Sequence, residues 1–423
     1  MPSRVVITGL GLIAPNANNT TEFLKALRDG RSGLRFVPEL EALGFACQVA
    51  AIPQGLETAM EMIPGNLRLA TNESMSYAAL AAMEAFQDAG LTPANADEPH
   101  DDTGAIIGTG IGGIDTFANR VYPNVHDHKI KRLGSTVVEQ MMGSGSSARI
   151  AGILGLGNQV FSNSSACNTG TEALIMGYYR IQMGLADRML VGGTEGSDPH
   201  TWAGFDSMKV LSRKFNHEPE AASRPMSETA GGFIPAAGAG VLVLERLETA
   251  LQRGARIYAE VIGTSINCGG MRAGGTMTMP SPQGVQKCIK QALEESRIDP
   301  RDVDYINGHL TATIADPMEL NNWALALKRE PGDFPWINST KSLIGHSLGA
   351  AGAIEAVATI LQLHYGFIHM SRNCEDFHPE IKDFAQHVPK STLDRPLTIA
   401  AKASFGFGDV NSCVIFKKWG VPE

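Results

Sequence analysis

Short apolar runs alternate along this chain with longer, alanine-rich segments of helical pattern. Runs at 5–11, 103–110, 238–245 and 257–263 have the length of strands. This alternation predicts an α/β fold in which a largely parallel sheet is covered by helices. No apolar stretch reaches the roughly 18 residues of a membrane span, and the N-terminus lacks a signal-peptide pattern.

A cysteine stands where one of these apolar runs gives way to a helical pattern. The run ends at Phe161, a small polar segment follows, and Cys167 lies where the helix is expected to begin. Backbone N–H groups and the positive end of the helix dipole favour a thiolate at such a position. The placement is typical of a nucleophile, but buried cysteines are more often inert, so alone it leaves both interpretations open.

Three later segments carry chemical groups in a similar setting. An apolar run at 303–307 leads into His309, and the segment 337–355 places Lys341 and His346 ahead of an Ala/Gly-rich helix. A glycine-punctuated loop follows at 403–411. One histidine alone indicates little, whereas four such segments in this order indicate a catalytic constellation rather than packing.

These segments resemble the elongating β-ketoacyl-acyl-carrier-protein synthases, which are condensing enzymes of the thiolase fold. The resemblance extends to the segments 5–11, 108–113, 223–227 and 238–245. The order Cys-His-Lys-His is specific, because initiating synthases show Cys-His-Asn and thiolases a second reactive cysteine. The resemblance implies two similar α/β halves in a five-layered α-β-α-β-α architecture. The N-terminal half, 1–255, would carry the nucleophile, and the C-terminal half, 256–423, the His-Lys-His set and a gating loop.

The reaction implied by the resemblance is a decarboxylating Claisen condensation. Cys167 would hold the acyl group as a thioester, and malonyl-acyl-carrier protein would supply two carbons and lose CO2. The backbone N–H groups of Cys167 and Phe407 would form the oxyanion hole, with Gly406 and Gly408 permitting the necessary backbone angles. His309 and His346 would stabilise the enolate as neutral donors.

A carboxylate on an otherwise apolar helix needs a partner. Glu355 is such a group, because an unpaired buried carboxylate is energetically costly. A pair with Lys341 would remove that cost and orient the histidines. The alternative is that Glu355 faces solvent.

Further substrate contacts are implied by the resemblance alone. Thr311 and Thr313 would bind the phosphopantetheine arm, Ile111 would line the acyl pocket at a dimer interface, and the loop 274–278 would border the entrance. Asp316 and Glu319 follow at helical spacing, and from the sequence we expect Asp316 to lie behind the site and Glu319 at the surface.

Four residues depart from the pattern of this family. They are Asn168 after the cysteine, Leu310 after the first histidine, and Asp409 with Val410 in the gating loop. Leu310 predicts a different local backbone or a narrower pantetheine channel. Asp409 predicts costlier loop opening or a more polar acyl pocket. We therefore expect a selective acyl range, as in a specialised polyketide-like or unsaturated-chain pathway.

The charge balance bears on the partner. A net charge of −9 argues against nucleic acid, which requires concentrated Lys and Arg. Two local basic clusters are either ordinary solvated faces or docking sites that steer an acidic carrier protein, and the resemblance favours docking. The clusters are Lys129, Lys131 and Arg132, and Arg213 with Lys214.

The cysteines, finally, bear on compartment and cofactors. Six cysteines without Cys-x-x-Cys spacing indicate neither a zinc site nor a disulfide framework, so we expect no metal and a cytoplasmic location. The resemblance implies a homodimer that needs no cofactor, because phosphopantetheine arrives on the carrier protein. The alternative is a non-catalytic, chain-length-determining subunit of a ketosynthase heterodimer. Such subunits lose the active-site cysteine, whereas Cys167 is present.

Overall fold

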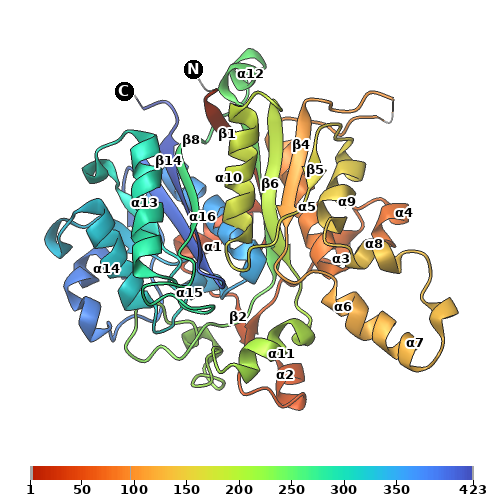
Figure 1. Cartoon of the computed structure of the whole chain (residues 1–423), viewed down its shortest axis with the longest axis horizontal. Helices are drawn as coiled ribbons and strands as arrows, with labels where there is room; N and C mark the ends of the chain where they lie inside the picture. Colours follow the sequence, from red (N-terminus) through yellow and green to blue (C-terminus); the bar gives the residue numbers. More distant parts are fainter. Residues whose placement is uncertain (1–2, 96, 422–423) are drawn as a thin grey trace.

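A mixed sheet runs through the middle of the molecule (Figure 1). The computed structural model describes residues 3–95 and 97–421. Within these residues the sheet has ten strands, in the order β10-β9-β13-β14-β8-β1-β7-β6-β4-β5. The strands of its first half are β1 (Val5–Ile13), β4 (Thr103–Gly108), β5 (Val160–Phe161), β6 (Arg188–Glu195) and β7 (Gly238–Arg246). Those of the second are β8 (Ala259–Cys268), β9 (Tyr305–Asn307), β10 (Trp336–Asn338), β13 (Ile399–Gly406) and β14 (Val410–Lys418).

The two halves of the sheet share one strand plan. When the strands of each half are numbered from one to five along the chain, both halves have the order 3-2-4-5-1. The same pairs are parallel in each half, and the same pairs are antiparallel. The first strands, β1 and β8, pair antiparallel and join the halves. The duplication is therefore visible in the topology, although the sequence shows too little self-similarity to reveal it.

Helices cover both faces of the sheet and also separate its halves. The central helices are α10 (Thr169–Gln182) and α16 (Ala351–Tyr365), and the outer ones are α5 (Glu73–Asp88), α9 (Gly145–Leu154), α13 (Pro282–Ser296) and α14 (Asp316–Leu327). Figure 1 shows α10 and α16 in the middle, α5 and α9 outside the first half, and α13 and α14 outside the second. The resulting α-β-α-β-α order confirms the five-layered thiolase fold.

The expectation of a largely parallel sheet is wrong. Among the described strands of the large sheet, four neighbouring pairs are parallel and five are antiparallel. Strands covered by helices on both faces read as continuous apolar runs in either direction. The hydrophobic pattern therefore identified the strands but carried no information on their relative direction.

Glycines allow the two central helices to meet at their N-terminal ends. A Cβ on Gly170 would lie 2.7 Å from the backbone nitrogen of Ala353, and one on Gly352 would lie 2.2 Å from Thr171 Oγ1. Side chains at either position would force the helices apart. The close approach brings the loops that precede α10 and α16 to the same end of the sheet.

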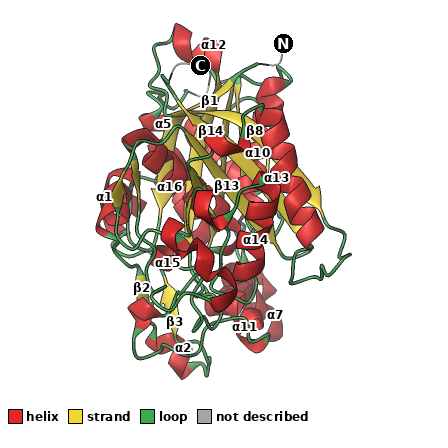
Figure 2. Ribbon diagram, turned by 90° about the vertical axis from the view of Figure 1, so that its left-hand side faces the viewer, coloured by secondary structure: helices red, strands yellow, loops and turns green. Residues whose placement is uncertain are grey.

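A small subdomain, here called the cap, closes this end of the molecule (Figure 2). The cap comprises residues 34–51 and 199–236 and encloses an apolar cluster that includes Leu40, Trp202 and Phe233. Its elements are β2 (Leu34–Phe36), α2 (Pro38–Ala42), β3 (Val49–Ala51) and α11 (Pro199–Ser207). The cap forms one wall of the candidate site.

The remaining elements are peripheral. An arm of residues 114–142 projects beside the first half of the sheet (Figure 1) and contains α6 (Ile114–Thr116), α7 (Tyr122–His126) and α8 (Val137–Met141). None of the described helices is long and apolar enough to cross a bilayer. The other elements are α1 (Thr20–Asp29), α3 (Glu57–Met60), α4 (Gly65–Arg68), α12 (Leu247–Gln252), α15 (Lys341–Ile344), β11 (Phe367–Ile368) and β12 (Leu393–Asp394).

Candidate active site

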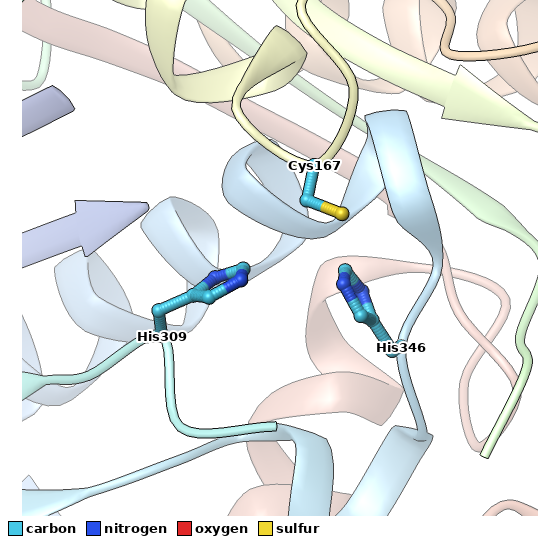
Figure 3. A group of neighbouring side chains, drawn as sticks. All are labelled: Cys167, His309 and His346. Carbon is cyan, nitrogen blue, oxygen red and sulfur yellow. The ribbon is translucent and has the colours of Figure 1, made fainter. Parts of the chain in front are cut away.

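Cys167, His309 and His346 line one pocket of about 180 Å³. Figure 3 shows the three side chains pointing toward one another from different segments of the chain. Cys167 Sγ and one nitrogen of each ring lie within 4.8 Å of one another. The walls are mainly apolar, with Phe205, Val210, Phe233, Met279, Phe405 and Phe407 among the lining residues.

Cys167 is held in a tight turn between β5 and α10. Ala166 adopts a left-handed φ of 49°, and the N–H of Ser165 donates to Thr169 Oγ1 at 2.8 Å. Gly406 packs against this turn, where a Cβ would lie 3.1 Å from the carbonyl oxygen of Ser165. The glycine thus brings the 406–408 loop against the cysteine. Helix α10 begins two residues later than expected, at Thr169.

Burial opposes thiolate formation at Cys167, contrary to the expectation from its place near a helix start. Burial raises the pKa of the thiol to about 11, while Lys341 and the backbone N–H groups of Phe407 and Cys167 act in the opposite direction. Desolvation outweighs these three contributions because the sulfur is enclosed in the pocket. The resting group is a thiol, so it can act as a nucleophile only with a neighbouring proton acceptor.

The two histidines have the protonation state that this acceptor needs. Burial, reinforced by Lys341 and Lys402, lowers the pKa of both rings well below 6.5, so both are neutral at pH 7. Their ring centroids lie 5.4 Å apart with an interplanar angle of 85°. His309 follows β9, and His346 follows α15. Neutral imidazoles can either accept a proton or donate a hydrogen bond.

The ion pair expected between Lys341 and Glu355 is present and buried. Lys341 Nζ contacts Glu355 Oε1 and also donates to the backbone carbonyl of His309 at 2.6 Å. Glu355 is therefore not exposed to solvent. The pair links the first turn of α15 to α16 and to the backbone that carries His309.

A third charged group of this cluster was not expected from the sequence. Lys402 Nζ lies 2.9 Å from Glu355 Oε2, and the residue is fully buried in β13. The sequence nevertheless contains a signal for Lys402, because this charged residue lies within the apolar run Ile399 to Ala403. Glu355 was identified by the same kind of signal.

Glu319 is buried, so its expected surface position is wrong. Its two carboxylate oxygens accept the N–H groups of His309 and Leu310, both at 2.7 Å. Burial raises its pKa to about 7. Asp316 lies behind the site as expected, accepting from the N–H groups of Thr311 at 2.9 Å and Ala312 at 3.1 Å. Burial raises the pKa of Asp316 to about 6. Together the two carboxylates fix the backbone after β9.

Thr311 and Thr313 both line the pocket, and their hydroxyl oxygens lie 3.0 Å apart on one side of the segment. Thr278, from the loop expected at the entrance, lines it as well. Leu310 points the other way and is buried in the hydrophobic core of the second half. The expected narrowing of a channel by Leu310 is therefore wrong, because its side chain packs against the core.

Asp409 also faces away from the pocket. Its carboxylate accepts the N–H groups of Met271 at 2.9 Å and Ser281 at 2.8 Å, so it fastens the 406–410 loop to the segment 269–281. The expectation that Asp409 makes the acyl pocket more polar is wrong, since it is fully buried and lies outside the lining. Gly408, at the same turn, donates its N–H to the carbonyl of Met277 at 2.8 Å.

The remaining predicted residues lie outside the pocket lining. Ile111 is 40% exposed beside the arm. Lys129, Lys131 and Arg132 are exposed on the arm, where Lys129 pairs with Asp127 at 2.7 Å. Arg213 and Lys214 are exposed on the cap, shortly after the pocket residue Val210.

Comparison with known proteins identifies the family. The model of the β-ketoacyl synthase N-terminal domain matches residues 2–250, and that of the C-terminal domain matches 258–375. The 3-oxoacyl-[acyl-carrier-protein] synthase 1 of Escherichia coli strain K12 is 37% identical over 418 residues, which cover 98% of this chain and 99% of that protein.

Solved structures agree with this assignment. A β-ketoacyl synthase from Burkholderia phymatum superposes with a TM-score of 0.90 at 28% identity, over 98% of this chain and 99% of that one. A type II polyketide ketosynthase, solved in complex with its acyl-carrier protein, gives 0.88 at 28% identity over 99% and 100%. The chain therefore belongs to the β-ketoacyl synthase family, the thiolase-fold acyltransferases that form β-ketoacyl thioesters by decarboxylating condensation.

Proposed function

We propose that this ketosynthase carries its acyl group on Cys167 and completes the condensation with His309 and His346. The observation that carries the proposal is the convergence of the cysteine sulfur and two neutral imidazoles within 4.8 Å in one apolar pocket. Lys341 and Glu355 act behind the histidines, where the lysine fixes the backbone carbonyl of His309.

In the first half-reaction an acyl thioester transfers its acyl group to Cys167. A neutral imidazole takes the thiol proton, the sulfur attacks the thioester carbonyl, and the carrier thiol leaves with a proton. The N–H groups of Cys167 and Phe407 stabilise the tetrahedral oxyanion, and each such donor is worth about 3 kcal/mol. Both N–H groups act to lower the pKa of the Cys167 thiol, which supports this assignment.

In the second half-reaction a malonyl thioester loses CO2, and the resulting enolate attacks the acyl group on Cys167. The carbon–carbon bond forms as the thioester bond to Cys167 breaks, which regenerates the free cysteine. Nδ1 of each histidine is enclosed by protein, so we assign Nε2 of both rings to the enolate oxygen. Decarboxylation supplies the carbanion, and no free cofactor is required.

The substrates arrive on an acyl carrier protein, whose phosphopantetheine arm reaches the pocket past Thr311 and Thr313. The solved polyketide relative binds such a carrier. We assign Arg213 and Lys214, near the pocket wall of the cap, and the arm cluster at 129–132 to docking of the acidic carrier.

A homodimer would place the arm near the partner subunit's site. Strand β5 is the outermost strand of the described sheet, and an edge of this kind can pair with a second copy. Ile111 would then line the acyl pocket from the interface. The arm also exposes apolar side chains that a partner would cover: Phe117, Tyr122, Val125, Ile130 and Val138.

We divide the chain into two halves, each of which carries part of the site. Residues 1–255 carry the nucleophile, and residues 256–423 carry the His-Lys-His set and the gating loop. The separate matches of the two family models and the repeated strand order support a boundary between α12 and β8. A cytoplasmic location is supported by the six free thiols, which suit a reducing compartment. Fractionation of cells that express the tagged chain tests that location.

A non-catalytic chain-length subunit is the alternative. The presence of Cys167 with both histidines in one pocket favours the enzyme. The test is incubation of the purified chain with an acyl-carrier thioester and malonyl-carrier protein. The enzyme releases CO2 and forms a β-ketoacyl product two carbons longer, whereas a non-catalytic subunit forms neither without a partner.

A further inference from the structure

Lys402 is the one residue of the buried charge cluster to which the proposed reaction gives no role. It lies in β13, where it pairs in register with Asn307 of β9, two residues before His309. Its side chain is fully buried. Lysine is seldom fully buried without a partner, because desolvation of an ammonium group is costly.

The contacts of Lys402 account for that burial. Its Nζ lies 2.9 Å from Glu355 Oε2 and 3.0 Å from Ser404 Oγ, and it also donates to the carbonyl of Ala403. Glu355 is thus held between two ammonium groups, since Lys341 takes the other oxygen. Burial lowers the pKa of Lys402, and Glu355 acts in the opposite direction. With both lysines protonated, two cations and one anion leave a net positive charge in the interior.

This excess charge lies directly behind the reacting groups. Lys341 joins the cluster to the backbone of His309, and both lysines contribute to the lowered pKa of His309 and His346, after burial. A fixed positive charge in a poorly solvated site stabilises negative charge that develops nearby. The enolate is such a charge, and it forms at the two imidazoles.

Neighbouring titratable groups offset this charge only in part. Glu319 acts on Lys402, and burial raises its pKa to about 7, so it is partly protonated at neutral pH. Asp316 acts on Glu319, and its carboxylate is engaged by the backbone N–H groups of Met226 and Thr311. Burial keeps Cys413 and Tyr305 protonated by raising their pKa values. The titratable groups that interact with Lys341, Glu355 or Lys402 are His309, His346 and Cys167 in the pocket, Glu319 from α14, Cys413 from β14, and Tyr305 from β9.

We propose that Lys402 is a positioning residue that anchors Glu355 and supplies a second buried positive charge behind His309 and His346, which stabilises the enolate. This role rests on the proposed decarboxylating function. It predicts that Lys402 affects the malonyl half-reaction and leaves acyl transfer to Cys167 largely unchanged.

The test compares Lys402→Met with the wild-type protein and with Lys417→Met, a half-buried lysine on the adjacent strand. Acylation of Cys167 is followed by intact mass, and CO2 release from malonyl-carrier protein is measured against pH. For Lys402→Met we expect acylation within twofold of wild type, kcat for CO2 release at least tenfold lower, and an unchanged KM. The acid limb of the rate profile moves to higher pH, because removing a cation raises the pKa of both histidines. Lys417→Met behaves as wild type.

Other outcomes overturn the proposal. Lys402 only fills the core if the variant loses equal rate in both half-reactions or if its kcat for CO2 release is unchanged. The same conclusion follows if the acid limb of its pH–rate profile does not move. If Lys402→Met does not fold, Lys402→Gln is used, since it keeps a hydrogen-bond donor to Glu355 without charge, and the same outcomes apply. A wild-type protein that releases no CO2 contradicts the proposed function itself, independently of any Lys402 variant.

Discussion

His309 and His346 share the pocket with a cysteine whose thiol is protonated at rest. In the proposed mechanism, acylation needs one neutral imidazole to accept that proton, whereas two imidazoles stabilise the enolate. Replacing either histidine with alanine should therefore reduce CO2 release by about a hundredfold or more, while acylation of Cys167 declines much less. Intact-mass analysis and CO2 release separate the two steps, and His126→Ala, which removes an exposed histidine, is the control. Equal losses in both steps would contradict this division of labour.

The same two residues predict how stability depends on pH. Their pKa values in the folded protein lie well below 6.5, so below that pH the unfolded chain binds protons that the folded chain does not. The contribution of the two histidines to the free energy of unfolding should therefore fall as the pH drops below about 6.5, whereas Glu319 and Asp316, whose pKa values are raised, contribute the opposite slope. Urea titrations from pH 7.5 to 5 measure this slope. The double variant His309→Asn/His346→Asn should show a shallower slope, and an identical slope would mean that the histidines are not buried as neutral groups.

The residues that meet at the candidate site could be predicted where a reactive group follows or interrupts an apolar pattern. Cys167, His309, His346 and Lys341 were identified in this way. Glu319 was placed at the surface because charged residues usually lie there, and only the fold brings backbone N–H groups to both of its oxygens. The direction of Leu310 could not be predicted either, because no periodic pattern fixes side-chain direction in the loop after a strand.

At the scale of elements, one carboxylate joins the two loops at the entrance. Asp409 holds the 406–410 loop against residues 269–281 through two backbone N–H groups. Cβ atoms at Gly269 and Gly275 would lie 2.1 and 2.6 Å from its Oδ2, so this packing requires glycines in the partner loop. The sequence identified Asp409 as unusual but could not show which side of the loop it faces.

Releasing this connection should broaden the acyl range. In Asp409→Gly/Val410→Thr the loop loses both a buried carboxylate and a β-branched residue, so opening costs less free energy. We expect faster amide hydrogen exchange at 269–281 and kcat/KM values that vary less from short to long acyl chains, with CO2 release nearly unchanged. The wild-type protein provides the baseline. If it already elongates short, medium and long saturated chains equally well, the loop does not limit the acyl range.

At the scale of the whole molecule, the repeated strand order brings the two halves of the site together. The loops after β5 and β10, the third strands of their halves, precede the two central helices and carry Cys167 on one side and Lys341 with His346 on the other. This arrangement could be predicted only through the family resemblance, because strand direction and pairing leave little trace in apolar patterning.

The acidic carrier protein should bind the enzyme at its exposed basic clusters. Arg213→Glu/Lys214→Glu should raise KM for carrier-bound substrate severalfold at low salt and leave kcat and small thioester analogues nearly unaffected, because rim charges act mainly on association. Reversal at Lys129, Lys131 and Arg132 tests the arm separately. The control variant Arg297→Glu/Lys328→Glu makes the same change in net charge at the C-terminal ends of α13 and α14. It should leave KM for carrier-bound substrate unchanged. An unchanged KM at low salt would remove a cluster from the docking surface.

Acylation of Cys167 tests the central claim most directly. Purified wild-type protein and Cys167→Ala are each incubated with an acyl-carrier thioester, analysed by intact mass, and then given malonyl-carrier protein. The wild-type protein should gain one acyl group, located by peptide mapping to Cys167, and lose it as the elongated β-ketoacyl product appears. Cys167→Ala should keep its fold, gain no acyl group and form no product. An acyl group on another residue, or condensation by the alanine variant, would contradict the account.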